Sequence, residues 1–258
     1  MTEGTLPNEL LWILFLIVDF SLALTAVYFF GRRALFVIIG ASIIVCNIQV
    51  LKTVELFGFV ATLGNIVYGS IFLATDLMGE TFGKKEARKG VWLGFYALLF
   101  MTVSMQFALW FNPHESDFVH PAMETIFGFI PRVAFASIVA YLLSQHHDIW
   151  AFHFWGKMTQ GRHLWLRNNL STWVSQAIDS LVFVMLAFYG VFEREVLLSI
   201  LLTTYVIKIL VALLDTPIIY MGRWVMQKHL EKYGTREDLK LLSEGSGLIT
   251  FRERSNRP

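Results

Sequence analysis

The chain has 258 residues, of which 55% are hydrophobic and only 16% are charged, and its mean hydropathy is +0.57. A soluble domain of this length normally carries about a quarter charged residues. The composition therefore excludes a soluble enzyme, a disordered chain and a nucleic-acid-binding protein. The lone cysteine, Cys46, also excludes a disulfide scaffold.

Long apolar segments dominate the chain. A run of about 18–25 apolar residues crosses the ~30 Å hydrocarbon core of a bilayer as a helix. Arg32 and Arg33 follow the first such segment and no basic residue precedes it, so it is expected to be a membrane helix rather than a cleaved signal. The sequence predicts an all-α, polytopic membrane helix bundle. Seven segments pass the length test: 10–30, 34–51, 57–75, 90–111, 124–143, 170–190 and 197–222.

The basic residues indicate the orientation of these segments. The loops after the first, third and fifth segments, together with the carboxyl-terminal tail, hold 17 Lys and Arg, whereas the other loops hold 2. Cytoplasmic loops of membrane proteins are enriched in Lys and Arg. We therefore expect a multi-pass protein of the cell (inner) membrane with its amino terminus outside and its carboxyl terminus in the cytoplasm. The basic run 83–89 could also bind anionic headgroups of membrane lipids.

Two shorter patterns add local predictions. Thr235 and Asp238 have the spacing of a capping box, which predicts a short helix through about Glu244 in the tail. Gly90 and Gly94 are spaced for close packing of two membrane helices.

Several ionisable residues lie within or beside the apolar segments. A charge at mid-bilayer is costly, so each such residue suggests a function. They are Asp19, Asp76, Glu80, Arg132, Asp179, Lys208 and Asp215.

Spacings of three and four residues place many of these side chains on shared helical faces. One face holds Asn65, Gly69, Phe72 and Asp76; a second holds Asn169, Thr172, Gln176 and Asp179; a third holds Thr204, Lys208 and Asp215; and Asn47 lies in the second segment. Because each residue adds about 1.5 Å along a helix, Asn65, Asp179 and Lys208 can share a mid-membrane level. A pocket there that mixes carboxylates, amides and a cation suits a small polar molecule better than an ion pore. An Asp179–Lys208 pair, or Arg132 with a carboxylate, could instead be a structural ion pair.

No motif indicates an enzyme, a metal site or a cofactor. HExxH, paired Cys/His spacing, GxSxG and the P-loop are all missing from the sequence. We therefore expect no catalytic residues, no metal and no cofactor.

Two stretches of the sequence resemble the signatures of a transporter family. The first is GSIFLATDLMGETFG over 69–83, followed by KKEAR over 84–88, and the second is STWVSQAIDSLVF over 171–183. Both resemble the queuosine precursor transporters, also called the vitamin uptake transporter family. Lys208 and Arg132 match that family in character and order, and the resemblance extends over about 34–222.

The resemblance implies import of 7-deazaguanines, namely preQ0, preQ1 or queuine, for tRNA modification. It also implies a six-helix core over 34–222, similar to the substrate-binding components of energy-coupling-factor vitamin transporters. Residues 1–33 are then an extra amino-terminal transmembrane helix, and 223–258 form a cytoplasmic tail. Asp19 falls outside the implied site, which leaves an oligomer contact or topology as its expected role.

The candidate residues suit a deazaguanine. We expect Asp179 to accept hydrogen bonds from the guanine edge, while Lys208 and Arg132 donate to the carbonyl O6 or balance Asp179. Asn47, Asn65 and Gln176 supply amides, and Tyr68 and Phe72 are expected to stack on the flat ring. Gating or structural roles are expected for Asp76, Glu80 and Asp215.

Two other functions are left open by the sequence. One is a vitamin-binding component with a different ligand that needs an ATPase partner, and the other is a membrane-embedded enzyme acting on lipid or isoprenoid substrates. The energy source, the preferred deazaguanine and the presence of a homo-oligomer are also left open.

Overall fold

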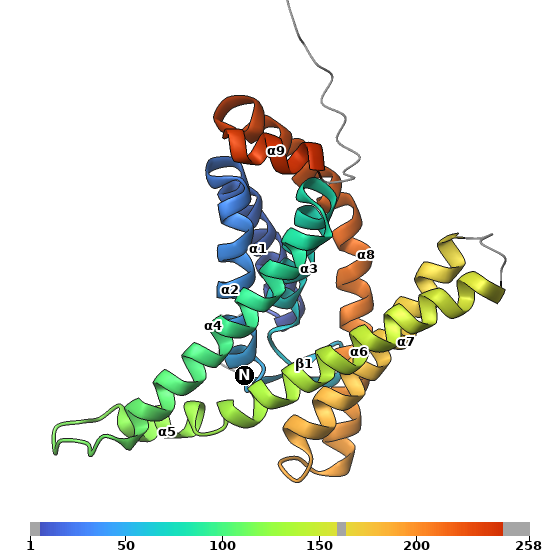
Figure 1. Cartoon of the computed structure of the whole chain (residues 1–258). Helices are drawn as coiled ribbons and strands as arrows, with labels where there is room; N and C mark the ends of the chain where they lie inside the picture. Colours follow the sequence, from blue (N-terminus) through green and yellow to red (C-terminus); the bar gives the residue numbers. More distant parts are fainter. Residues whose placement is uncertain (1–5, 159–163, 245–258) are drawn as a thin grey trace, which may run out of the picture.

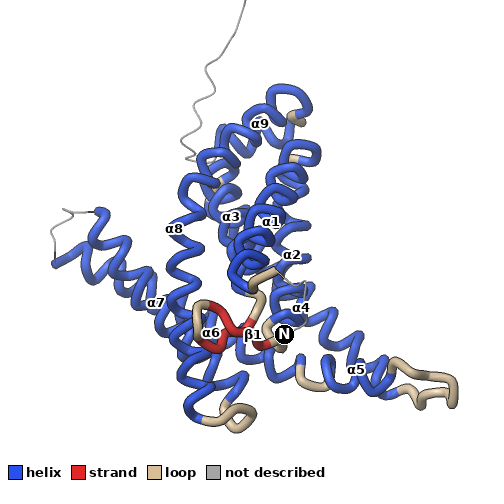
Figure 2. The backbone as a smooth tube through the Cα atoms, turned by 180° about the vertical axis from the view of Figure 1, so that it is seen from behind, coloured by secondary structure: helices blue, strands red, loops and turns tan. Residues whose placement is uncertain are grey.

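A computed structural model of the chain describes residues 6–158 and 164–244, and these are mostly helical (Figures 1 and 2). The elements in chain order are α1 (Asn8–Phe30), α2 (Arg32–Gln49), β1 (Thr53–Leu56), β2 (Phe59–Thr62), α3 (Asn65–Phe82), α4 (Lys84–Trp110), α5 (His120–Phe127), α6 (Ile130–Met158), α7 (Leu164–Phe188), α8 (Arg194–Tyr233) and α9 (Arg236–Glu244).

Four helical segments of the described residues are long and apolar enough to cross a membrane. They are Asn8–Phe30, Arg32–Gln49, Lys84–Trp110 and His120–Ser144, and Trp173–Phe188 forms a shorter apolar helix. The structure therefore agrees with the expected helical membrane bundle.

The third predicted segment, 57–75, is only partly helical. The strands β1 and β2 pair antiparallel over 53–62, and α3 begins only at Asn65. Phe57 and Gly58 form the tight turn between the strands with φ values of 53° and 79°. A short apolar run does not by itself distinguish a strand from a helix. The structure thus adds a two-stranded hairpin to the all-α fold and places Asp76 and Glu80 in the last two turns of α3.

Other boundaries also move. The predicted segment 124–143 is divided between α5 and α6, and α8 continues to Tyr233, beyond the predicted end at 222. Val225, Met226 and Leu230 belong to a buried core cluster with residues of α2 and α3, so the first part of the predicted tail packs within the bundle.

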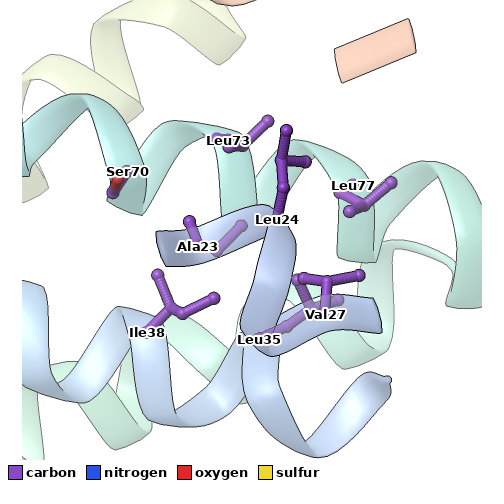
Figure 3. A pocket seen from close by; sticks show the side chains of 9 residues that line it. Ala23, Leu24, Val27, Leu35, Ile38, Ser70, Leu73 and Leu77 are labelled. Carbon is purple, nitrogen blue, oxygen red and sulfur yellow. The ribbon is translucent and has the colours of Figure 1, made fainter. Parts of the chain in front are cut away.

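The helices α1, α2, α3 and α8 lie side by side in an upright bundle, while the α6–α7 hairpin projects from its base to one side (Figure 1). The interface of α1, α2 and α3 is apolar and closely packed. The crevice between them in Figure 3 has no room for a water molecule, and its lining is aliphatic apart from Ser70.

Glycines allow the close contact of α4 with α2. A Cβ atom added at Gly90 would lie 2.7 Å from the Ile39 side chain, and one added at Gly94 would lie 3.0 Å from it. The predicted role of this glycine pair in helix packing is therefore confirmed.

The predicted capping box is also confirmed. The Thr235 hydroxyl accepts a hydrogen bond from the Asp238 backbone N–H at 3.2 Å, and the Asp238 carboxylate accepts one from the Thr235 backbone N–H at 3.1 Å. These two bonds start α9, which lies at the end of the bundle beside the α1–α2 turn (Figure 1).

Candidate functional site

A cavity of about 930 Å³ lies between α2, α3, α6, α7 and α8, and the first half of α4 also lines it. This is within the volume range of about 300–1,000 Å³ that is usual for small-molecule sites. One end of the cavity is lined by Thr62, Leu63 and Gly64, directly after the β-hairpin, and the other end reaches Lys84 and Arg88 at the start of α4. The cavity therefore extends along α3 from the hairpin toward the end of the bundle that carries α9.

The cavity brings together most of the residues that the sequence singled out. Ten of them line it: Asn47, Asn65, Tyr68, Phe72, Asp76, Glu80, Gln176, Asp179, Thr204 and Lys208. Arg132 lies elsewhere, and the side chain of Asp215 is outside the part of the chain that the structure describes, as are those of Asn169 and Thr172.

The central feature of the cavity wall is an ion pair between α7 and α8. Lys208 donates a hydrogen bond to the Asp179 carboxylate, and both residues are buried, with 8% and 5% of their surface exposed. Asp179 also accepts a bond from the Ser144 hydroxyl at 3.3 Å, and the Lys208 ammonium lies 4.9 Å from the centre of the Tyr68 ring. The structure thus forms the ion pair that the sequence left open, and places it on the wall of a cavity rather than in a solid helix interface.

Amide and aromatic side chains complete the wall. Asn47 donates to the Ile43 carbonyl at 2.6 Å and accepts from the Ser137 hydroxyl at 2.7 Å. The rings of Tyr68 and Phe72 meet edge to face with their centres 4.9 Å apart. The cavity therefore offers a flat ligand aromatic surfaces on α3 and oriented polar groups on the other helices.

The contribution of α6 to the cavity was not predicted from the sequence. Ser137, Tyr141 and Ser144 line the cavity, and the two serines orient Asn47 and Asp179. Serine is common at the packing interfaces of membrane helices, so its presence in an apolar segment did not stand out. The available signal was the spacing: residues 137, 141 and 144 lie on one helical face.

Arg132 departs from its expected place in the cavity. It lies near the start of α6 and is exposed, and its guanidinium donates to the backbone carbonyls of Leu186 at 2.8 Å and Tyr189 at 2.6 Å. These carbonyls are at the end of α7, where the last residues of a helix lack intrahelical partners. Its geometry is that of a helix cap, and a sequence pattern cannot distinguish such a cap from a ligand contact.

The remaining acidic residues occupy three different settings. Glu80 Oε2 lies 3.3 Å from Arg223 Nε of α8, near the end of the cavity that Lys84 and Arg88 line. Asp76 lines the cavity one turn before Glu80. Asp19 lies on α1 and accepts a hydrogen bond from the Ser70 hydroxyl at 2.5 Å, on the side of α3 that packs against α1.

Comparison with known proteins shows the family to which the chain belongs. Residues 62–222 match the sequence profile of the family described as "Putative vitamin uptake transporter". The chain belongs to this family. The matched region contains α3 to α7 and most of α8, and thus every element of the cavity except α2.

Three curated members are named as queuosine precursor transporters. The chain is 46% identical over 217 residues to the "Probable queuosine precursor transporter" of Bacillus subtilis (strain 168), an overlap that covers 84% of this chain and 95% of the relative. It is 29% identical over 170 residues to the "Queuosine precursor transporter" of Escherichia coli (strain K12), covering 65% of this chain and 74% of the relative. It is 33% identical over 134 residues to a "Probable queuosine precursor transporter" of Haemophilus influenzae, covering 52% and 54%. No solved structure matches the chain.

Proposed function

We propose that this member of the family imports queuosine precursors, 7-deazaguanines such as preQ0, preQ1 or queuine, across the cell inner membrane for tRNA modification. The names of its curated relatives support this substrate class. The observation that carries the proposal is the buried Asp179–Lys208 pair on the wall of a cavity with aromatic and amide side chains.

The chemistry of the pair suits the guanine edge. An ionised carboxylate offers about four lone-pair sites. Lys208 and Ser144 occupy two of these on Asp179, so among the described residues two are left to accept the N1–H and 2-amino groups of the ligand. Lys208 balances the negative charge of Asp179 and leaves the cavity unfilled. A site that binds a ligand by several hydrogen bonds rejects analogues that lack them, because its polar groups are then left unpaired.

The orientation of the chain follows from the positive-inside rule. Arg32 and Arg33 begin α2, and Lys84, Lys85 and Arg88 lie in the first two turns of α4. The starts of both helices are at the end of the bundle that carries α9 (Figure 1). We propose that this end faces the cytoplasm and that the hairpin end faces outward. The end of the cavity that Lys84 and Arg88 line then lies on the cytoplasmic side.

Uptake of labelled preQ1 by cells that cannot synthesise deazaguanines tests the proposal. Expression of the protein is expected to produce uptake and to restore queuosine in tRNA. A matched control is Asp19→Asn, because Asp19 is a carboxylate within a membrane helix that does not line the cavity. We expect this variant to keep most of the uptake, and absence of uptake by the wild type would contradict the proposal.

Direct binding separates this proposal from a vitamin-binding component with an ATPase partner. Purified protein is expected to be stabilised by preQ1 or queuine and not by riboflavin or biotin; ligand at about 100 times its Kd adds roughly 2.7 kcal/mol. Stabilisation by a vitamin alone would favour the alternative.

A further inference from the structure

Three buried oxygen atoms of cavity-lining residues have no hydrogen-bond partner within the described residues. Two of them are Thr204 Oγ1 on α8 and Gln176 Oε1 on α7. Leaving a buried polar atom unpaired costs free energy, so such an atom in a native fold calls for an explanation. A third cavity-lining atom of this kind, Glu80 Oε2, lies 3.3 Å from Arg223 and is explained by that charge.

Two buried helical threonines of the described residues, Thr81 and Thr204, have a hydroxyl without a hydrogen-bond partner, and of these two Thr204 lines the cavity. A threonine within a helix commonly donates its hydroxyl to the backbone carbonyl four residues earlier. Thr75, Thr102 and Thr203 do so at 2.8 Å, to Ile71, Leu98 and Ser199. Thr204 is 3% exposed and makes no such bond. Its donor is therefore free for another acceptor, which a small rotation of the side chain within its rotamers can reach.

The two residues that carry these atoms lie on either side of the Asp179–Lys208 ion pair. Gln176 precedes Asp179 by three residues on α7, and Thr204 precedes Lys208 by four residues on α8. Since α7 and α8 run in opposite directions (Figure 1) and the ion pair joins them, Gln176 and Thr204 lie on opposite sides of the pair. At about 1.5 Å per residue, Gln176 lies about 4.5 Å before Asp179 along α7, and Thr204 lies about 6 Å before Lys208 along α8.

This arrangement suits a ligand edge that carries polar groups at both ends and in the middle. A guanine-type edge does so, from its carbonyl O6 through N1–H to its 2-amino group. It presents an acceptor followed by donors, in the order in which the wall presents a hydroxyl, a carboxylate and an amide oxygen.

We propose that Thr204 and Gln176 are specificity-determining residues that bind the two ends of the guanine edge. This inference rests on the proposed function. The Thr204 hydroxyl donates to O6, Asp179 accepts from N1–H and the 2-amino group, and Gln176 Oε1 accepts the second 2-amino hydrogen. The five-membered ring then faces the interior of the 930 Å³ cavity. The site therefore recognises the 2-amino-6-oxo ring and tolerates different substituents on it, while rejecting adenine-type rings.

Binding of ligand analogues to purified variants tests this assignment. Thr204→Val removes the hydroxyl at nearly constant volume, and Thr204→Ser is its matched control, since it keeps the hydroxyl. We expect Thr204→Val to raise the Kd of preQ1 about tenfold, and Thr204→Ser to change it by less than about threefold. A preQ1 analogue with hydrogen in place of O6 also lacks N1–H and should bind the wild type more weakly, but Thr204→Val is expected to leave the Kd of this analogue unchanged. Gln176→Leu should behave in the same way toward preQ1 and an analogue without the 2-amino group.

The outcomes separate this assignment from the proposed function. Failure of the wild type to bind any deazaguanine would contradict the proposed function itself. Binding of preQ1 by Thr204→Val at the wild-type Kd, or equal losses for preQ1 and the O6-free analogue, would overturn only the assignment of Thr204. The unliganded thermal midpoint of Thr204→Val should equal or exceed that of the wild type, because the variant removes an unpaired buried hydroxyl; a lowered midpoint would indicate a structural role instead.

Discussion

The Asp179–Lys208 pair and the Arg32 cluster are built from the same kinds of groups, but their surroundings differ. Asp179 and Lys208 are buried on a cavity wall between α7 and α8. Arg32 lies at the α1–α2 turn and contacts three carboxylates, at 3.1 Å on Glu86, 2.7 Å on Glu237 and 3.1 Å on Asp238.

The comparison shows that position decides what a charge does. The Arg32 cluster joins the start of α2 to the start of α4 and to α9, and one of its members, Glu237, is 70% exposed at the side chain. Its partners satisfy its donors, and its role is to hold α9 on the bundle. The Asp179–Lys208 pair keeps acceptor capacity that faces a cavity, and this makes it a candidate for ligand binding.

The largest effect is expected from Asp179→Asn. This substitution preserves the shape of the side chain but replaces an acceptor oxygen by a donor, so it removes the bonds to the guanine edge and the partner of Lys208. Uptake of labelled preQ1 should fall to the background level while the protein still inserts in the membrane. Wild-type uptake by correctly inserted Asp179→Asn would exclude Asp179 from the site.

Substitution of Lys208 distinguishes an effect on stability from an effect on transport. Breaking a buried ion pair from one side costs about 3–5 kcal/mol, because the other charge is left uncompensated. Lys208→Met should therefore lower the thermal midpoint and abolish uptake. The double variant Asp179→Asn with Lys208→Met should recover stability but not uptake; recovery of both would show that the pair is only structural.

A smaller effect is expected from Arg32→Gln. Loss of its charge-assisted hydrogen bonds should cost about 1–3 kcal/mol and loosen α9, with little change in the Kd of preQ1. Faster amide hydrogen exchange over 236–244 would be the direct evidence. A raised Kd of preQ1 with unchanged exchange would instead connect Arg32 to the cavity.

The attachment of α9 should also depend on pH. Burial of Asp238 opposes its ionisation, but hydrogen bonds from the Thr235 hydroxyl and backbone N–H and the charge of Arg32 outweigh it, so the pKa of Asp238 lies below its ordinary value. This contribution to stability is fully present above the ordinary pKa of about 3.9 and is lost as the pH falls through the lower folded-state pKa. The protection factors of the α9 amides, which correct for the pH dependence of intrinsic exchange, should therefore be constant from pH 7 to 5 and decrease below about pH 4.

The smallest effect on transport is expected from Arg132→Gln. Because Arg132 caps backbone carbonyls at the end of α7, its loss should cost about 1 kcal/mol of stability and leave the Kd of preQ1 within about twofold of the wild type. A large increase in this Kd would restore the ligand-binding role that the sequence predicted for it.

The membrane helices were predictable because apolar runs and helical periodicity are local properties of the sequence. Local patterns likewise predicted the capping box at Thr235 and the close approach at Gly90. The β-hairpin over 53–62 was not predictable, since its apolar residues suit a strand as well as a helix, and a positive φ at Phe57 is not a preference of phenylalanine.

The sequence identified which residues could form the candidate site, whereas the tertiary structure decided which of them line the cavity. The cost of burying charge in a bilayer identified Asp179 and Lys208 before any contact was known. Only the packing of α6, α7 and α8 decided that these two residues pair beside a cavity, that Arg132 caps a helix instead, and that Thr204 is left with a free hydroxyl. The physical reason is that a side chain's chemistry is local, whereas its partners come from helices far apart in the chain.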